Sequence, residues 1–129
     1  MDPKLLTLIL PKPMPSYQRR NDHVFFGKDF VSNVNSVGFE DLGDGYGKDY
    51  NNIYFMGKIV EKGQPYGFKV LRDGYAMDHD HVYFLGTLVK GGRPYGFEVL
   101  RDGYAKDYSN VYQYGLLIKN VLPFVFQPQ

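Results

Sequence analysis

The chain has 129 residues, 43% of them hydrophobic, and a formal net charge of +1 at pH 7. This length suits one domain with a modest core, and the scattered lysines and arginines disfavour nucleic acid as the main partner, which would require a basic stripe. The sequence has no cysteine, which excludes disulfides and cysteine-ligated metals, and it has 12 Tyr and 10 Phe.

The N-terminal region starts with a short apolar run, Leu5–Leu10, followed by Pro11, Pro13 and Pro15. This run is too short for the apolar part of a signal peptide, and a membrane span needs about 20 residues. We therefore expect residues 1–18 to form an edge strand that ends in a proline-rich turn. We also expect no membrane span and a cytoplasmic location, or a periplasmic one if a leader has been removed.

Most of the chain repeats at a fixed spacing of 29 residues. Residues 67–95 and 96–124 align without a gap and share 16 identical positions. Residues 38–66 are a looser copy, and residues 19–37 are a shorter, degenerate one. A repeated core cannot easily hold one unique catalytic constellation, because equivalent residues fill each position. The repeat therefore favours a scaffold or a binding module over an enzyme.

Each copy contains short runs of Val, Ile, Tyr and Phe bounded by Gly, Asp and Asn, which is typical of strands. Asp-Gly pairs such as Asp102-Gly103 predict tight hairpin turns, and an Asp before a polar trio, as at Asp107, predicts a second turn. The end of the chain, residues 125–129, is a tail that follows a short apolar strand broken by Pro123. We expect one all-β domain in which tandem antiparallel hairpins of about 29 residues form a single twisted or rolled sheet.

The run Tyr104–Tyr112, with Gly96–Leu100 before it and Gly115 after it, resembles the repeat of the DKNYY family. The resemblance extends from about Arg19 to Lys119. It implies a bacterial, β-rich repeat module with no defined activity and no catalytic residues to transfer. The chain departs from the motif where Lys would follow the repeated Asp. These positions hold Tyr50, His79 and Tyr108.

The densest group of possible metal ligands is Asp78-His79-Asp80-His81. Imidazole and carboxylate both suit zinc or nickel. These positions align with turn residues in the other copies, however, and no cysteine or third histidine lies nearby. Calcium ligation by the recurring Asp49, Asp78 and Asp107 would require more acids in each loop than the copies supply. We expect these aspartates to cap turns, with no metal or cofactor bound and no enzymatic activity.

Positions that differ between the copies are candidates for partner binding, because the fold does not dictate their identity. Strand alternation places Phe55 on the face opposite Tyr54. If one sheet face is open, such side chains form an exposed apolar patch; if the sheet folds into two layers, they are covered. The candidate partner-binding residues are Phe55, Phe84, Tyr108, Tyr114, His79 and His81.

The most specific functional hypothesis is a non-catalytic protein-binding module, a bacterial immunity protein that binds and neutralises a cognate toxin. The alternative is a cell-surface or envelope repeat protein that binds glycan or another ligand. A third possibility, an enzyme, would require a site in the variable loops around Lys62-Gly63, Gly91-Gly92-Arg93 and Asn120.

Overall fold

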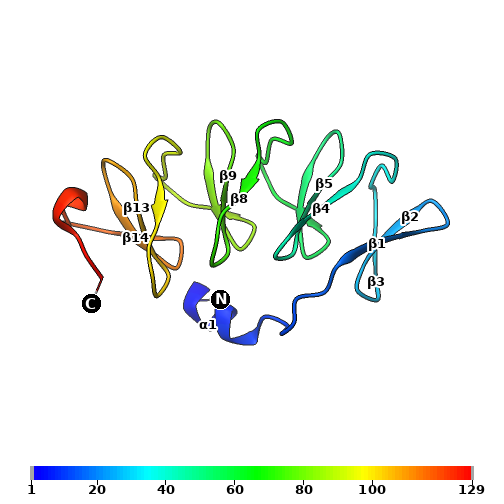
Figure 1. Ribbon diagram of the computed structural model, residues 1–129, viewed down its shortest axis with the longest axis horizontal. Helices are drawn as coiled ribbons and strands as arrows, with labels where there is room; N and C mark the ends of the chain where they lie inside the picture. The colour runs from blue at the N-terminus through cyan, green and yellow to red at the C-terminus, as the bar shows by residue number, and fades with distance from the viewer. Residues whose placement is uncertain (1, 129) are drawn as a thin grey trace.

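The computed structural model describes residues 2–128 and shows four small antiparallel β-sheets arranged in a curved row (Figure 1). The first sheet has three strands and each of the others has four, which confirms the predicted all-β repeat architecture. The sequence predicts one continuous sheet, and this is wrong. Linking loops such as residues 60–67, which contain Gly63, Pro65 and Gly67, interrupt strand pairing between copies.

The strands follow one another as simple meanders. The first sheet contains β1 (Tyr17–Arg20), β2 (His23–Phe26) and β3 (Asp29–Val31). The second contains β4 (Glu40–Gly43), β5 (Tyr46–Lys48), β6 (Ile53–Phe55) and β7 (Lys58–Ile59). The third contains β8 (Lys69–Val70), β9 (Tyr75–Met77), β10 (Val82–Phe84) and β11 (Thr87–Leu88). The fourth contains β12 (Glu98–Val99), β13 (Tyr104–Lys106), β14 (Val111–Gln113) and β15 (Leu116–Ile118).

We refer to the first to fourth units as residues 17–37, 38–66, 67–95 and 96–124. The first unit lacks a counterpart of β4, and its three strands match the last three of the other units. Tyr17 pairs with Phe26 as Tyr46 pairs with Phe55. The degenerate copy therefore includes Tyr17, and it begins the array with an incomplete sheet.

Tyrosine hydroxyls connect each unit to the next. The hydroxyl of Tyr46 donates to the carbonyl of Gly74 at 2.9 Å and accepts from the N–H of Gly86 at 3.0 Å. Tyr75 makes the same two bonds to Gly103 and Gly115, at 2.7 and 3.0 Å. Since these tyrosine rings are fully buried, each junction between units has an apolar interior with its polar groups satisfied.

Two-residue hairpin turns force large side chains into an uncommon backbone conformation. Leu85 and Gly86, which join β10 to β11, have φ values of 48° and 78°, as a type I′ turn requires. Glycine suits the second position, but a leucine at positive φ is strained. Met56 and Tyr114 occupy the equivalent position in the neighbouring units, with φ values of 50° and 48°. Leu85 and Tyr114 face the N-terminal segment, since they line cavities together with Leu6 and Leu10.

The N-terminal segment is helical where the sequence predicts an edge strand. Helix α1 (Pro3–Ile9) begins at Asp2, whose side chain accepts a hydrogen bond from the N–H of Lys4 at 2.9 Å. An aspartate N-cap followed by proline at the first helical position is a strong helix start. The helix lies along the lower side of the array in Figure 1, and the proline-rich segment after it leads back to β1.

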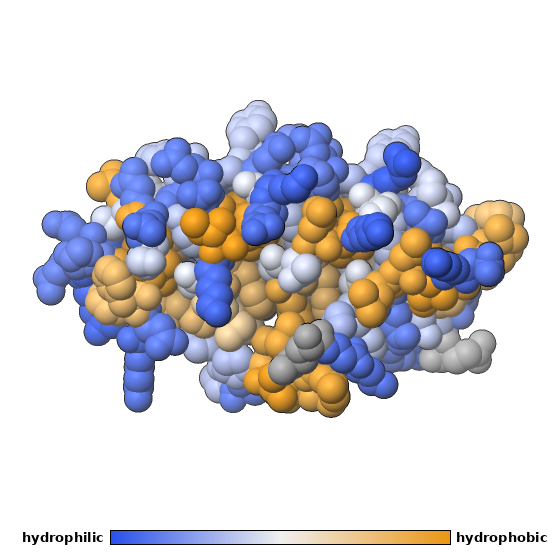
Figure 2. All heavy atoms as spheres, turned by 180° about the vertical axis from the view of Figure 1, so that it is seen from behind, coloured by the Kyte–Doolittle hydropathy of each residue, from blue (hydrophilic) through white to orange (hydrophobic). Residues whose placement is uncertain are grey.

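Helix α1 packs on the array through one side only. Leu6 and Leu10 contact the core, whereas Leu5, Leu8 and Ile9 are exposed. Figure 2 shows the helix as an apolar patch on the lower edge of the molecule. Within residues 2–128, no helix is both long enough and apolar enough to span a membrane.

The C-terminal region also differs from the predicted strand at residues 121–126. Residues Pro123–Val125 form a short 3₁₀ helix, η1, because proline is well suited to the first position of a helical turn. The ring of Phe126 then packs against Tyr104 at 5.0 Å. This contact is equivalent to the Phe97–Tyr75 pair one unit earlier, at 5.5 Å, so the tail covers part of the last sheet.

Candidate functional site

The recurring aspartates build one edge of the array by closing turns. The Oδ1 atom of Asp78 accepts hydrogen bonds from the N–H groups of Asp80 and His81, at 2.9 and 2.8 Å. Its Oδ2 atom accepts from the hydroxyl of Tyr83 at 2.7 Å and from the N–H of Gln64 at 3.1 Å. Asp49 and Asp107 make the corresponding bonds in the second and fourth units. The predicted turn-capping role is therefore confirmed.

The same bonds determine the charge state of these buried carboxylates. Burial disfavours the ionised form of Asp78, but the Tyr83 hydroxyl and three backbone N–H groups outweigh it, and together they lower the pKa below its ordinary value. The pKa of Asp49 is lowered by the equivalent set of groups. Burial, reinforced by Asp49, raises the pKa of Tyr54 to about 12. In the Asp49–Tyr54 and Asp78–Tyr83 pairs, an ionised aspartate thus accepts a hydrogen bond from a neutral tyrosine.

Each aspartate also holds a linking loop in place. The N–H of Gln64 lies 14 residues before Asp78, and the N–H of Arg93 is bound in the same way by Asp107 at 3.0 Å. In the sequence, Gln64 and Arg93 are each followed directly by a proline and an aromatic residue, Pro65-Tyr66 and Pro94-Tyr95. Hydrogen bonds to the aspartates therefore fix the linking loops to the turns. Tyr66 and Tyr95, which come two residues after the bonded N–H groups, extend into solvent.

Exposed rings follow this edge, which lies at the top of Figure 1. Tyr66 and Tyr95 are 85% and 81% exposed, which is far more than isolated aromatic side chains usually are. The rings pair in register: Tyr66 with His79 at 5.9 Å, and Tyr95 with Tyr108 at 5.3 Å. We define the aromatic edge as the six exposed residues Tyr50, Tyr66, His79, Tyr95, Tyr108 and Phe124.

Glycines beneath the rings explain how the aromatic edge is held. The rings of His79 and Tyr108 lie directly over Gly67 and Gly96, so close that a Cβ atom on either glycine would overlap the ring. Both glycines also have positive φ, 78° and 75°, which side chains rarely adopt. The backbone therefore provides a platform under His79 and Tyr108, and these two rings in turn contact Tyr66 and Tyr95.

A cleft of about 560 Å³ lies on this edge between the third and fourth units. Its floor is the linking loop Gly91-Gly92-Arg93-Pro94, which the sequence identifies as variable. We call it the junction cleft. The remaining residues that line it are His79, Asp80, Tyr95, Tyr108 and Ser109.

The run Asp78–His81 is arranged as a turn and not as a metal centre. The carboxylate of Asp78 is occupied by the turn and by Tyr83, while the ring of His79 lies on Gly67. His81 is half-buried, and its Nδ1 atom has no hydrogen-bond partner in the described chain. Among residues 2–128, no group of three or more His, Cys, Asp or Glu side chains is placed to hold a metal ion.

The structure separates the six predicted partner-binding residues. Tyr108 and His79 belong to the aromatic edge, and His81 follows in the same turn. The expected exposure of Phe55 and Phe84 is wrong, since they are only 9% and 4% exposed. Both rings pack over the hairpin glycine of the next unit, with a Cβ built on Gly86 only 2.6 Å from the Cβ of Phe55. Stacking of the units thus covers the faces of the second and third sheets that carry Phe55 and Phe84.

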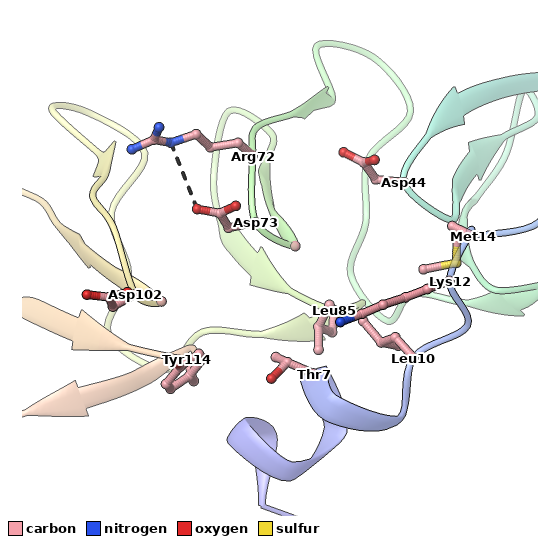
Figure 3. Close-up of a pocket in the computed structure, with 12 residues that line it drawn as sticks. Thr7, Leu10, Lys12, Met14, Asp44, Arg72, Asp73, Leu85, Asp102 and Tyr114 are labelled. Atoms are coloured by element: carbon pink, nitrogen blue, oxygen red, sulfur yellow. Dashed lines mark ion pairs between the residues drawn. The ribbon is translucent and has the colours of Figure 1, made fainter.

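Tyr114, the sixth residue, lies on the opposite edge beside the N-terminal segment. There it lines a second cleft of about 620 Å³, together with Leu85, Leu10 and Met14. Figure 3 shows Asp44, Asp73 and Asp102 on three successive hairpins around this cleft, with Arg72 and Asp73 4.0 Å apart. The N-terminal segment fills part of the space, so Tyr114 acts first as a support for that segment.

The prediction missed Tyr66, Tyr95 and Phe124. Their signal is the recurring proline-aromatic pair, which in the second and third units lies in a loop and directly precedes the platform glycine, Gly67 or Gly96. An aromatic side chain in a loop, fixed by proline and without strand neighbours, has no core to enter. This pattern indicates exposure more reliably than variation between strand positions.

The fold and the edge define a class of protein: a β-repeat array that presents a periodic row of exposed rings. Sequence comparison makes this more specific, because residues 17–126 match the DKNYY family. With nearly the whole array matched, the chain belongs to the DKNYY family. No curated protein sequence and no solved structure matches the chain.

Proposed function

We propose that this chain is a non-catalytic protein-binding module, that the aromatic edge is its contact surface, and that its partner is a toxin which it neutralises as an immunity protein. The observation that carries the proposal is the row of exposed rings in fixed register over glycine platforms. Tyrosine is enriched among the residues that dominate binding energy in protein interfaces. Exposed apolar groups in a row are typical of a partner site.

The rigid presentation of the rings favours tight binding. A tyrosine side chain has two main torsions to order, and here Asp78, Asp107 and the glycine platforms already constrain the loops around it. Less conformational entropy is therefore lost on association. A standard interface of about 800 Å² per partner would extend over several units of such an edge.

The recurring carboxylates support a non-catalytic function. Asp49, Asp78 and Asp107 each accept four hydrogen bonds, and their repetition serves the turns. A catalytic carboxylate needs at least one oxygen available for substrate. The toxin as partner is the more specific part of the proposal, and it follows from the small, single-domain, preorganised character of the chain.

The alternative, a surface repeat protein that binds glycan, is favoured by one observation. The junction cleft combines the Tyr95 and Tyr108 rings with Arg93, Asp80 and Ser109, and ligand sites commonly combine apolar rings with a few polar groups. A glycan array would separate the two functions, since the protein-binding proposal expects no saturable glycan binding.

Capture from source-cell lysate tests the proposal with three tagged proteins: the wild type, a Tyr66→Ala/Tyr95→Ala variant, and a Leu5→Ala/Leu8→Ala control. All four substituted side chains are exposed, so we expect unfolding free energies within about 0.5 kcal/mol of one another. The wild type and the control should retain one stoichiometric protein, and the tyrosine variant should lose it.

The toxin step needs its own readout. Expression of the captured protein in a susceptible host should arrest growth, and co-expression of the wild-type chain, but not of the Tyr66→Ala/Tyr95→Ala variant, should restore it. Equal retention of the partner by both variants would exclude the aromatic edge as the contact surface. A captured protein without toxicity would leave a binding module and remove the immunity function.

A further inference from the structure

The junction cleft is the place where the repeat is least regular. His79 replaces the tyrosine found at positions 50 and 108, and Asp80 replaces Asn51 and Ser109. Arg93 stands where the preceding linking loop has Gln64. Three side chains that differ from their equivalents in the other copies therefore line one cleft. The other units show that the fold does not require any of them.

Arg93 is available for a ligand. Its backbone N–H is bound to Asp107, which fixes the position of the residue, but its side chain is exposed. In the described part of the chain no carboxylate forms an ion pair with its guanidinium. The nearby carboxylate of Asp80 instead accepts a hydrogen bond from the side-chain amide of Gln64 at 2.9 Å.

The charge around the cleft favours an acidic partner. The linking loops that form this edge, residues 60–67, 89–96 and 118–122, contain four exposed cations and one acid. The cations are Lys62, Lys90, Arg93 and Lys119, and the acid is Glu61. Asp80, in the turn beside these loops, is a second exposed acid on this edge. The opposite edge presents the exposed aspartates of the Asp-Gly turns, Asp44, Asp73 and Asp102, of which the last two pair with Arg72 and Arg101. Charge is thus distributed unequally between the two edges, and an approaching acidic segment is attracted to the aromatic edge.

We propose that the junction cleft binds the carboxylate of an Asp or Glu side chain in an extended segment of the protein partner. This inference rests on the protein-binding function proposed above. The planar guanidinium of Arg93 matches a carboxylate in a bidentate geometry, which the amide of Gln64 at the equivalent position of the preceding loop cannot reproduce. The rings of Tyr95 and Tyr108 line the same cleft and provide apolar surface beside the pair.

The repeat itself supplies the test variant. Arg93→Gln gives the linking loop of the third unit the residue of the second, so the variant should fold as the wild type does. Lys69→Gln removes one positive charge from the exposed side of β8, outside the cleft, and is the matched control. The probe is a short poly-L-glutamate, titrated into the ¹⁵N-labelled chain and followed by the backbone amide shifts in NMR.

We expect saturable shifts at residues 79–81 and 91–95, with a Kd that Arg93→Gln raises about tenfold and Lys69→Gln raises less than about twofold. Shifts spread over both edges, or an unchanged Kd in Arg93→Gln, would overturn the proposal. A parallel titration with polygalacturonate presents carboxylates on sugar rings. Binding of that polymer in place of poly-L-glutamate would also overturn it and assign the cleft to a glycan.

The lysate experiment keeps this inference separate from the protein-binding function. If Arg93→Gln still captures the partner at wild-type yield while Tyr66→Ala/Tyr95→Ala does not, the carboxylate site is wrong and the protein-binding function stands. If poly-L-glutamate binds at the cleft and no protein is captured, the carboxylate site stands and the protein-binding function fails.

Discussion

At the scale of single residues, the structure depends on polar side chains that are buried and fully paired. Asp78 is 3% exposed and accepts four hydrogen bonds from a turn, a tyrosine and a linking loop. One side chain therefore closes the turn and positions the exposed loop beside it. Removing its charge should affect both the stability of the unit and the order of the aromatic edge.

Asp78→Asn should lower the free energy of unfolding by about 2–3 kcal/mol, because hydrogen bonds to a charged acceptor are lost and the new amide N–H₂ faces the donors on Gln64 and Tyr83. Chemical denaturation measures the change. Asp80→Asn is the control, since Asp80 is exposed and the second unit has Asn51 there, and it should cost less than about 0.5 kcal/mol. Equal losses in the two variants would refute the structural role.

Stability should fall at both ends of the pH range. The pKa values of Asp49 and Asp78 are lowered in the folded chain, so their stabilisation is complete above the unfolded value of about 3.9 and is lost as the pH decreases through the folded values. The pKa values of Tyr54 and Tyr75 are raised to about 12. Their contribution is complete below about pH 10 and is lost as the pH increases towards 12. Urea unfolding across this range should show a plateau between the two losses, and a constant stability would contradict these assignments.

At the scale of the elements, the close approach of consecutive units depends on turn glycines. Gly86 combines a φ of 78° with immediate contact to Phe55 of the preceding unit. Gly43 has a similarly positive φ of 91°, but no other atom lies within 4 Å of where its Cβ would be. Substitutions at Gly43 and Gly86 therefore distinguish the cost of backbone strain alone from the cost of strain combined with a steric clash.

Gly86→Ala should destabilise the chain by about 3 kcal/mol, the sum of the positive-φ strain and the displacement of Phe55 from a packed core. Gly43→Ala should cost only the strain, about 1–2 kcal/mol. Thermal and chemical unfolding of the two variants measures the difference. If the two losses are the same, Phe55 is not packed against Gly86 as the structure shows.

The elements also show what the sequence could predict. Val, Ile and Tyr runs with Asp-Gly turns correctly indicate the strands, because each hairpin is determined by its own residues. The length and apolar character of the Leu5–Leu10 run predict a strand, although Asp2-Pro3 is a helix start. Alternation within a strand places Phe55 opposite Tyr54 but carries no information about a second sheet stacked on that face, so the sequence leaves an open and a covered face as alternatives. Local sequence patterns therefore predict the strands and turns of each unit, but not how one unit packs against the next.

At the scale of the whole molecule, stability is distributed along a row in which each unit contacts its neighbours. The Tyr17, Tyr46 and Tyr75 hydroxyls link successive units, and the bonds between the recurring aspartates and the preceding linking loops cross the same junctions. In such an array, weakening one junction should uncouple the units on its two sides instead of unfolding all of them together.

Tyr75→Phe tests this coupling, because it removes two hydrogen bonds and leaves the Gly115 N–H without a partner, at a cost of about 1–3 kcal/mol. Hydrogen exchange should increase most in residues 96–124 and least in residues 17–37. Tyr104→Phe is the control: within residues 2–128 its hydroxyl makes no corresponding bonds, and its loss should change little. Uniform loss of protection along the chain would instead indicate a single cooperative block.

The tyrosine link has a consequence for how such a chain can change over generations. Each hydroxyl bonds a carbonyl 28 residues ahead and an N–H 40 residues ahead, in every unit that makes the link. Unequal recombination that duplicates the codons for residues 67–95 would therefore insert a copy whose contacts already fit on both sides. One such duplication would add a whole unit together with its pair of exposed rings. The binding edge could therefore lengthen in a single genetic event, and the new unit would use the same core packing as its neighbours.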